Sequence, residues 1–342
     1  MMRLHKIIAI LLIFSSCNSN GERKETTENE NDNWYKGPII DMHMHAESNN
    51  TLPPEKLALC LPLSNLVPHF DPEQEFGKVW DSTLKNPRCK TPIYSSTTFE
   101  DYSSRIQDQL NKFNVTPMVS GSQSVLKEWT TKFGDKIIPS IEFNLERDKI
   151  SVDSLKIIIN KHDIKVIGEI SNQYSGIAPN DPRMDSYYAM AEELNIPVAI
   201  HLGTGAPGSP YLFSPKYVAA YSNPLLLEEV LKKYPRLRIS VMHYGEPFID
   251  EMITMMYHYP QIYVDLGGIQ WAYPSEYFYE FHLRKMVSAG FGKRIMFGSD
   301  TFIWPELLER SIEIINNAEF LTKEQKADIF YNNAARFLRL KN

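Results

Sequence analysis

Short apolar runs recur along the chain from Gly37 onward, and longer stretches with helical spacing of apolar residues separate them. Eight runs are too short for helices and lack a polar face, which is the pattern of strands buried on both sides in a parallel sheet. We predict these strands at residues 38–42, 115–120, 137–143, 165–170, 196–201, 237–243, 261–266 and 294–298.

Helix start signals lie between the predicted strands. A capping residue followed by proline opens the stretches at 181–194 and 223–234, and proline is favoured in the first turn of a helix. Thr322 is followed three positions later by Gln325, the spacing of a capping box. The chain therefore alternates strands with helices.

Eight strands, each followed by a helix, predict a (β/α)8 TIM barrel, in the α/β fold class, over residues 34–342. The largest insertion, residues 46–97, follows the first strand and is rich in proline and polar residues. Such an insertion could form a lid or one wall of a pocket. The alternative is an open doubly wound sheet, which is less favoured because no glycine-rich phosphate loop is present.

Composition narrows the class of protein. The 342 residues are 43% apolar and 23% charged, with a formal charge of −6. An acidic chain does not favour nucleic acid as a partner, since nucleic-acid binders usually carry a basic face. No apolar run reaches the ~20 residues that a spanning helix needs.

The N-terminus has the pattern of an export signal. A basic start precedes an eight-residue apolar run at 7–14, and residues 14–17 read Phe-Ser-Ser-Cys. This ending resembles a bacterial lipobox, so we expect residues 1–16 to be a lipoprotein signal peptide and Cys17 to be lipidated. An ordinary signal peptide with an incidental cysteine is the alternative.

Residues 17–33 are predicted to be a disordered tether, because this polar segment contains no large apolar residue. The expected location is the bacterial cell envelope, lipid-anchored on the periplasmic face or the outer surface. Removal of the signal changes the formal charge from −6 to −8. Cys60 and Cys89 then remain, and the sequence leaves open whether they pair or stay free.

Polar residues stand where the predicted strands end. His43 and His45 follow the first strand two positions apart, so both side chains can point to one side. The other strand-end candidates are Glu169, His201, His243 and Asp300. In a barrel these ends meet at the catalytic face. The remaining histidines, which we expect to be surface residues or packing residues with satisfied hydrogen bonds, are His5, His69, His162, His258 and His282.

This arrangement resembles the amidohydrolase superfamily, and within it the amidohydrolase-2 group of metal-dependent hydrolases and decarboxylases, over residues 37–340. The shared features are Asp41-x-His43-x-His45, Asp181-Pro182-Arg183, His201, His243, Gly298-Ser299-Asp300 and the closing segment 332–338.

The resemblance implies ligation of a metal by His43, His45, His201 and Asp300, and a catalytic or second-metal role for His243. Glu169 stands where relatives with two metals often carry a modified lysine. We include it among the candidate ligands, and whether it bridges metals, binds substrate or orients a ligand stays open.

Three imidazoles and a carboxylate suit Zn²⁺, with Mn²⁺ or Fe²⁺ as alternatives. A metal of this kind lowers the pKa of a bound water toward ~7. Asp300 is expected to take the proton as water attacks a carbonyl, while His243 polarises that carbonyl or stabilises the oxyanion. In a decarboxylase the same groups would bind a carboxylated substrate, and His243 would handle the proton on carbon.

The loops after the strands are aromatic and poor in cations, which favours a small, aromatic or cyclic substrate. The aromatic residues are Tyr211, Phe213, Tyr217, Trp271, Tyr273, Tyr277, Phe278, Phe302 and Trp304. Binding of a carboxylate calls for a cation, and only Arg88, Arg147 or Arg183 could reach in.

Hydrolysis of an ester, amide or lactone is therefore the first hypothesis. A metal-dependent decarboxylase is second, and a non-catalytic envelope binding protein, which the complete ligand set disfavours, is third. A homo-oligomer is compatible with the sequence, which does not define the oligomeric state.

Overall fold

The structure is a computed structural model that describes residues 33–66 and 69–340. The predicted signal peptide, Cys17 and residues 18–32 of the tether lie outside the described residues. The described residues group into one compact unit. None of the described helices is long and apolar enough to cross a bilayer.

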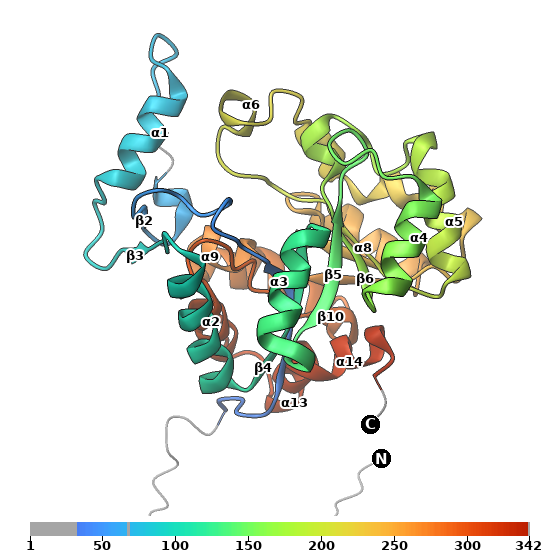
Figure 1. The fold of residues 1–342 in the computed structure, drawn as a ribbon. Helices are drawn as coiled ribbons and strands as arrows, with labels where there is room; N and C mark the ends of the chain where they lie inside the picture. The colour runs from blue at the N-terminus through green and yellow to red at the C-terminus, as the bar shows by residue number, and fades with distance from the viewer. Residues whose placement is uncertain (1–32, 67–68, 341–342) are drawn as a thin grey trace, which may run out of the picture. The chain divides into compact units, whose positions relative to one another are not determined.

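Eight parallel strands form the nearly closed barrel that the sequence predicts, with helices between them (Figure 1). In sheet order the strands are β1 (Ile39–His45), β4 (Val115–Gly121), β5 (Ile138–Phe143), β6 (Val166–Ile170), β7 (Val198–His201), β8 (Ile239–Met242), β9 (Ile262–Asp265) and β10 (Ile295–Met296). The first and last strands meet through backbone hydrogen bonds from the Met42 amide to the Phe297 carbonyl and from the His45 amide to the Thr301 carbonyl, both 2.9 Å. This contact rules out the open doubly wound sheet.

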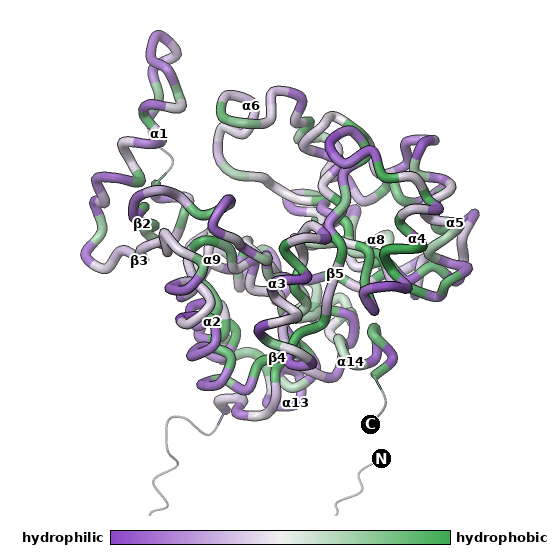
Figure 2. Tube along the Cα trace, viewed as in Figure 1, coloured by the Kyte–Doolittle hydropathy of each residue, from purple (hydrophilic) through white to green (hydrophobic). Residues whose placement is uncertain are grey.

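Most helices lie outside the barrel, and hydrophilic and hydrophobic residues alternate along them, whereas the strands within are mainly hydrophobic (Figure 2). In chain order after the insertion, the α-helices are α2 (Phe99–Phe113), α3 (Gln123–Phe133), α4 (Val152–Lys161), α5 (Asp185–Glu193), α6 (Ser209–Leu212), α7 (Glu228–Lys233), α8 (Ile249–His258), α9 (Ile269–Ala272), α10 (Ser275–Phe278), α11 (Arg284–Ser288), α12 (Leu307–Asn316), α13 (Lys323–Ala327) and α14 (Asn333–Leu338). Helices α6 and α9 lie in the segments that follow β7 and β9, and α14 packs against the inside of the barrel. The predicted capping box is confirmed at α13, where the Thr322 and Gln325 side chains each accept a hydrogen bond from the other's backbone amide.

Two clusters of buried apolar residues stabilise the barrel and its helices. A large cluster fills the space between strands and helices, and a smaller one fills the inside of the barrel. The inner cluster includes Met42 of β1, Met118 of β4 and Met242 of β8, and Phe337 of α14 packs against it. Burial of such side chains contributes roughly 1.5–3 kcal/mol each, so the barrel is a rigid support for whatever its rim carries.

The last strands are shorter than predicted, and a polar residue with a left-handed backbone conformation follows two of them. His243 follows β8 with a φ of 56°, and Asp300 follows β10 with a φ of 54°. A left-handed conformation is costly for residues other than glycine and is often found at functional sites. The strands therefore stop where the candidate site begins.

The insertion at 46–97 contains a two-stranded antiparallel sheet, β2 (Ala58–Leu59) with β3 (Ile93–Tyr94), and one helix, α1 (Phe76–Lys85). A disulfide joins Cys60 to Cys89, which settles the alternative left open by the sequence. Helix α1 lies against α6, and the rings of Phe76 and Tyr211 are 6.1 Å apart. The insertion thus reaches the loop that follows β7.

Candidate active site

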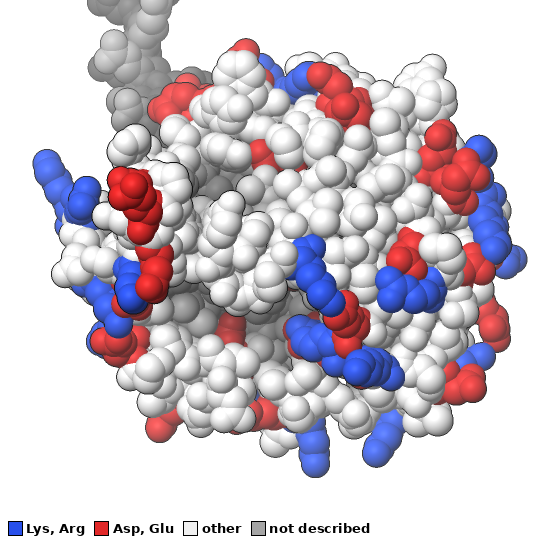
Figure 3. Space-filling model, turned by 90° about the horizontal axis from the view of Figure 1, so that it is seen from above, with Lys and Arg blue, Asp and Glu red and all other residues white. Residues whose placement is uncertain are grey.

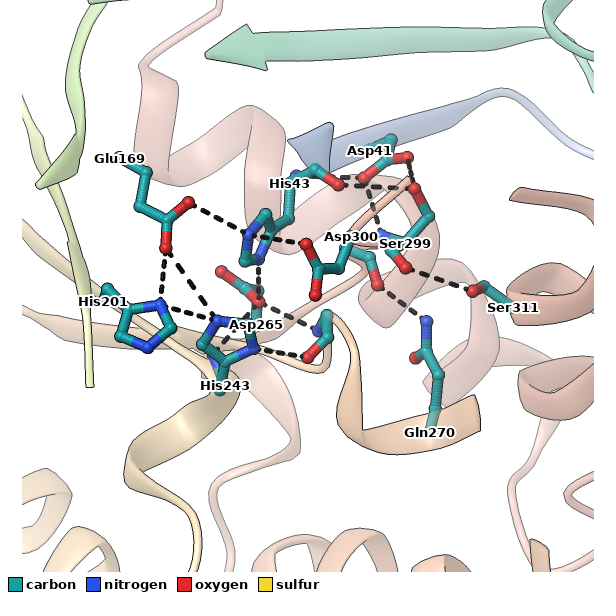
Figure 4. A network of polar contacts seen from close by, with 12 residues as sticks. Asp41, His43, Glu169, His201, His243, Asp265, Gln270, Ser299, Asp300 and Ser311 are labelled. Carbon is teal, nitrogen blue, oxygen red and sulfur yellow. Dashed lines mark hydrogen bonds and ion pairs between the residues drawn. The ribbon is translucent and has the colours of Figure 1, made fainter. Parts of the chain in front are cut away.

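The polar residues predicted at the strand ends converge in one cluster at the carboxyl end of the barrel (Figure 4). His45 Nε2 lies 3.1 Å from Asp300 Oδ1, and His43 Nε2 lies 3.4 Å from the same oxygen. Glu169 Oε2 completes this side at 3.7 Å from His43 Nε2 and 3.5 Å from His45 Nε2. Four of the predicted residues therefore face a common point.

His201 and His243 adjoin the same cluster from the next two strands. His201 Nδ1 is 2.5 Å from Glu169 Oε1 and 3.0 Å from His243 Nε2. Two groups of side chains bring their ligand atoms close enough for one ion: His43 with Glu169 and His243, and His43 with His45 and Asp300. His201 reaches the cluster as predicted, but beside Glu169 rather than in either group.

Local irregularities of the strands aim two of these side chains. The pairing of β1 with β4 shifts register between Asp41 and Met44, the segment that carries His43. The pairing of β6 with β7 shifts between Ile167 and Ile170, the segment that carries Glu169. A bulge of this kind bends the strand and redirects its side chains, and bulges are frequent next to active sites.

Buried carboxylates fix the orientation of the first histidine. Asp265 Oδ1 is 3.1 Å from His43 Nδ1 and also accepts a hydrogen bond from the Gly267 amide at 2.9 Å. Because a carboxylate accepts the proton on Nδ1, the lone pair of His43 lies on Nε2 and faces the cluster. Asp41 accepts hydrogen bonds from the His43 amide and from the amide and hydroxyl of Ser299, which ties β1 to the segment after β10.

The carboxylates of the cluster favour positive charge on the histidines beside them. Burial alone lowers the pKa of His43, but the nearby charges of Asp265 and Asp300 raise it well above its usual value. Burial likewise opposes protonation of His45, yet Asp300 and Glu169 raise its pKa to about 9. Burial raises the pKa of the Glu169 carboxyl, and the hydrogen bonds from His201 and His43 outweigh this and lower it well below its usual value.

His243 differs from its neighbours. Burial and the charges of His201 and His43 lower its pKa to about 4, so its ring is neutral near pH 7. Its Nδ1 is 2.8 Å from the carbonyl oxygen of Gly267, which can only accept a hydrogen bond. The ring proton therefore lies on Nδ1, and Nε2 presents a lone pair to the cluster. In this state His243 accepts a proton rather than donating one.

The cluster fits a divalent cation. The buried Nε2 atom of His43 has no hydrogen-bond partner, although carboxylate oxygens lie 3.4 and 3.7 Å away. A buried polar atom left without a partner is costly, and a cation at this point would satisfy it while replacing the protons that the imidazoles otherwise attract. His43, His45, Glu169, His243 and Asp300 supply the borderline nitrogen and hard oxygen donors that zinc, manganese and iron accept.

A cavity of about 690 Å³ opens above the cluster. Four of the predicted aromatic residues line it: Phe213, Trp271, Tyr273 and Phe302. The others do not line it; Phe278, for example, is buried in the outer core. The view onto the face that carries α1 and α6 shows this surface hollowed, with carboxylate groups visible inside (Figure 3).

Among the three arginines considered from the sequence, Arg147 lines the cavity and the other two do not. Its guanidinium donates to Asp148 at 2.7 and 3.0 Å and to Glu142 at 3.1 Å. Arg183 is held at the surface by Asp181. The charge of Arg147 is thus already balanced by carboxylates of the protein.

Sequence reasoning missed several residues of this region. Asp265 ends β9 after an apolar run, the same signal that marked the other strand ends, and could have been found by it. Glu47 and Glu142 line the cavity without such a signal. The expectation for His282 was partly wrong: it is buried, 4% exposed, but neither ring nitrogen has a hydrogen-bond partner among the described residues, because aromatic rings surround it.

Comparisons with solved structures support the fold. An uncharacterised TIM-barrel protein from Bordetella bronchiseptica aligns with a TM-score of 0.60 at 17% identity, covering 88% of this chain and 98% of that one. A probable 2-pyrone-4,6-dicarboxylic acid hydrolase from Acinetobacter baumannii gives 0.57 at 14% identity, with 89% and 100% covered. A 2,6-dihydroxybenzoate decarboxylase gives 0.53 at 15% identity, with 90% and 100% covered.

The comparison with curated protein sequences finds no significant match. The sequence model described as amidohydrolase, by contrast, matches residues 40–340, which span the whole barrel and every residue of the cluster. The family usually binds a divalent metal, in agreement with the donor set described above. The chain belongs to the amidohydrolase-2 family of metal-dependent enzymes.

Proposed function

We propose that the protein is a metal-dependent hydrolase that cleaves an ester, amide or lactone bond in a small, ring-bearing substrate. The observation that carries this proposal is the cavity above the cluster: Asp300 lies at its base, and the described residues that line it include no lysine and no arginine free of a carboxylate partner. A decarboxylase must hold the carboxylate of its substrate, and apart from the metal the described lining offers no free cation for it. Hydrolysis makes no such demand, so this lining favours it.

Asp300 is the proposed general base. Burial raises the pKa of its carboxyl, but the charges of His43 and His45 outweigh this and lower it below its usual value, so the group is ionised near pH 7. A divalent cation, when bound, supplies the Lewis acidity that makes water acidic and polarises a carbonyl. Asp300 can then accept the proton of the attacking water, a role that typically contributes about 10²–10⁴-fold in rate.

His243 is the second proposed catalytic residue. Its Nε2 lone pair faces the cluster, so this atom can receive the proton and deliver it to the leaving group. Stabilisation of an oxyanion, which the sequence also suggested, would require a ring proton that faces the substrate. The one proton of the neutral ring is on Nδ1, where the Gly267 carbonyl accepts its hydrogen bond. We therefore assign His243 to proton transfer.

The test is a panel of small aromatic esters, amides, lactones and acids, assayed on protein loaded with zinc or with manganese. We expect hydrolysis with zinc and no release of carbon dioxide from the acids. Carbon dioxide release without hydrolysis would favour the decarboxylase. Metal analysis of the purified protein tests the zinc assignment, and metal-free protein without any change on loading would favour a binding role.

We also propose that the protein is anchored in a bacterial cell envelope through Cys17. The Cys60–Cys89 disulfide supports export, because disulfides persist mainly in oxidising compartments. Cys17→Ser should block lipid attachment and release the protein into the soluble fraction. Unchanged membrane fractionation of this variant would contradict the proposal.

A further inference from the structure

The residues that line the cavity fall into two chemical sets. We call the aromatic residues the aromatic wall; they are Tyr174, Phe213, Trp271, Tyr273 and Phe302. We call Glu47 and Glu142 the acidic wall: burial raises the pKa of both carboxyls and the charge of His45 opposes that rise in both, so both lie near it. These two glutamates are separate from Glu169 and Asp300, which belong to the proposed metal cluster.

Glu47 is the least compensated of the carboxylates that line the cavity. The residue is 7% exposed, and no described lysine, arginine or histidine forms an ion pair with it. Burial raises the pKa of the Glu47 carboxyl, and the contact with Thr51 and the charge of His45 oppose that rise only in part. A buried carboxylate without an ion-pair partner is costly, which points to a partner that arrives with the ligand.

Glu142 adds negative charge to the same wall. Arg147 is the sole lysine or arginine among the described residues that line the cavity, and it binds both Glu142 and Asp148. The single guanidinium of Arg147 is therefore balanced by two carboxylates, and Glu47 adds a third negative charge. This wall carries an excess of negative charge that a cation in the metal cluster, already surrounded by Glu169 and Asp300, does not remove.

We propose that Glu47 and Glu142 form a recognition subsite for a positively charged group of the substrate, such as a protonated amine. This inference rests on the proposed function and names its substrate class: a ring-bearing ester, amide or lactone that also carries a cationic group. The aromatic wall strengthens it, because the faces of Trp, Tyr and Phe rings attract cations. An anionic substrate would meet repulsion from both carboxylates.

The experiment measures binding to zinc-loaded protein by calorimetry, with probes that differ in charge. Benzyltrimethylammonium is a cation without a lone pair, so it cannot ligate the metal. N-benzylacetamide is its neutral counterpart, and benzenesulfonate is an anion. We expect the cation to bind about tenfold or more tightly than the neutral probe, which corresponds to about 1.4 kcal/mol.

Two substitutions test whether these glutamates cause the preference for the cationic probe. Glu47→Gln should reduce affinity for the cation about tenfold, because a buried charged partner is lost. Glu142→Gln should reduce it about twofold to fivefold, since that carboxylate is 30% exposed and partly screened. Neither should change affinity for the neutral probe. Glu193→Gln, an exposed residue of α5 outside the cavity, is the matched control, and thermal melting verifies the fold of each variant.

Equal affinity for the cation and the neutral probe, or a preference that survives both substitutions, overturns the subsite. Tighter binding of benzenesulfonate also overturns it and identifies Arg147 as an anion site instead. Hydrolysis of the panel of esters, amides and lactones is measured in parallel, with cationic members such as benzoylcholine beside neutral ones such as phenyl acetate. Absence of hydrolysis across the whole panel contradicts the proposed hydrolase, while the binding preference still decides the subsite, so the two failures are distinguishable.

Discussion

The floor and the walls of the cavity are built in different ways. The floor, defined as the cluster of His43, His45, Glu169, His201, His243 and Asp300, stands at strand ends that the barrel fixes on all sides. Of the walls, Glu142 stands on β5, whereas Glu47 stands in the insertion at 46–97 and the aromatic residues stand in the segments that follow the strands. Chemistry is thus placed on the rigid element, and selection of the substrate largely on segments that can vary without disturbing it.

This difference predicts which substitutions abolish activity and which only change its selectivity. Floor residues share charges and hydrogen bonds within a few ångströms, so the loss of one alters its neighbours. Wall residues contact the ligand more independently. Four experiments, taken from the largest expected effect to the smallest, test this division.

Asp300→Asn should have the largest effect. The asparagine keeps the shape but cannot ionise, so His43 and His45 lose their common carboxylate and the attacking water loses its base. We expect a normal melting temperature, weaker metal binding and a loss of about two or more orders of magnitude in kcat. Asp250→Asn, on the exposed surface of α8, is the control. A variant that keeps both its metal and its rate would show that the floor is not the reaction centre.

His243→Asn should lower the rate about 10²–10⁴-fold, the usual range for loss of an acid–base group. If one ion sits with His43, His45 and Asp300, the metal content should survive, because this group does not include His243. Loss of about half the metal would instead reveal a second ion held by His243 with Glu169. His258→Asn on α8 controls for the substitution itself.

Asp265→Asn tests positioning rather than chemistry. Asp265 contacts His43 at Nδ1, not at the Nε2 atom that faces the cluster, and it does not line the cavity. Loss of such a partner typically costs about 10–100-fold in metal affinity. Titration against a chelator should show this loss, and saturating zinc should restore most of the rate. Failure of zinc to restore the rate would place Asp265 in the reaction itself.

Much of the floor could be predicted from the sequence, because an apolar strand that ends in a histidine or carboxylate is a local signal. His43, His45, Glu169, His201, His243 and Asp300 were all located in this way. The strand bounds were less accurate where left-handed residues such as His243 end the strand early. The number of strands was right because each predicted strand is an apolar run that can be recognised within five to seven residues.

The walls could not be predicted to the same extent. Glu47 lies in the insertion, and its position depends on contacts such as the Trp129 indole donating to its backbone carbonyl, 82 residues away in sequence. Arg147 was considered as a cation for the substrate, yet its pairing with Glu142 and Asp148 depends on a loop conformation that no local pattern encodes. The pairing of Cys60 with Cys89 was likewise undecided until the fold brought them together.

The smallest effect is expected when the disulfide is removed by the double substitution Cys60→Ser and Cys89→Ser. The bridge closes a segment that contains α1, which contacts α6 above the cavity. Disulfides typically contribute about 2–4 kcal/mol, and here the loss should fall on the insertion because the core inside the barrel contains no residue of the insertion. Limited trypsin digestion should therefore cut near Lys85 or Lys90 sooner than in the unmodified protein. Metal content and kcat should be unchanged, with KM raised about twofold to fivefold, less than 1 kcal/mol of binding. Loss of metal in this variant would mean that the insertion also stabilises the floor. The floor and the walls would then not be independent of each other.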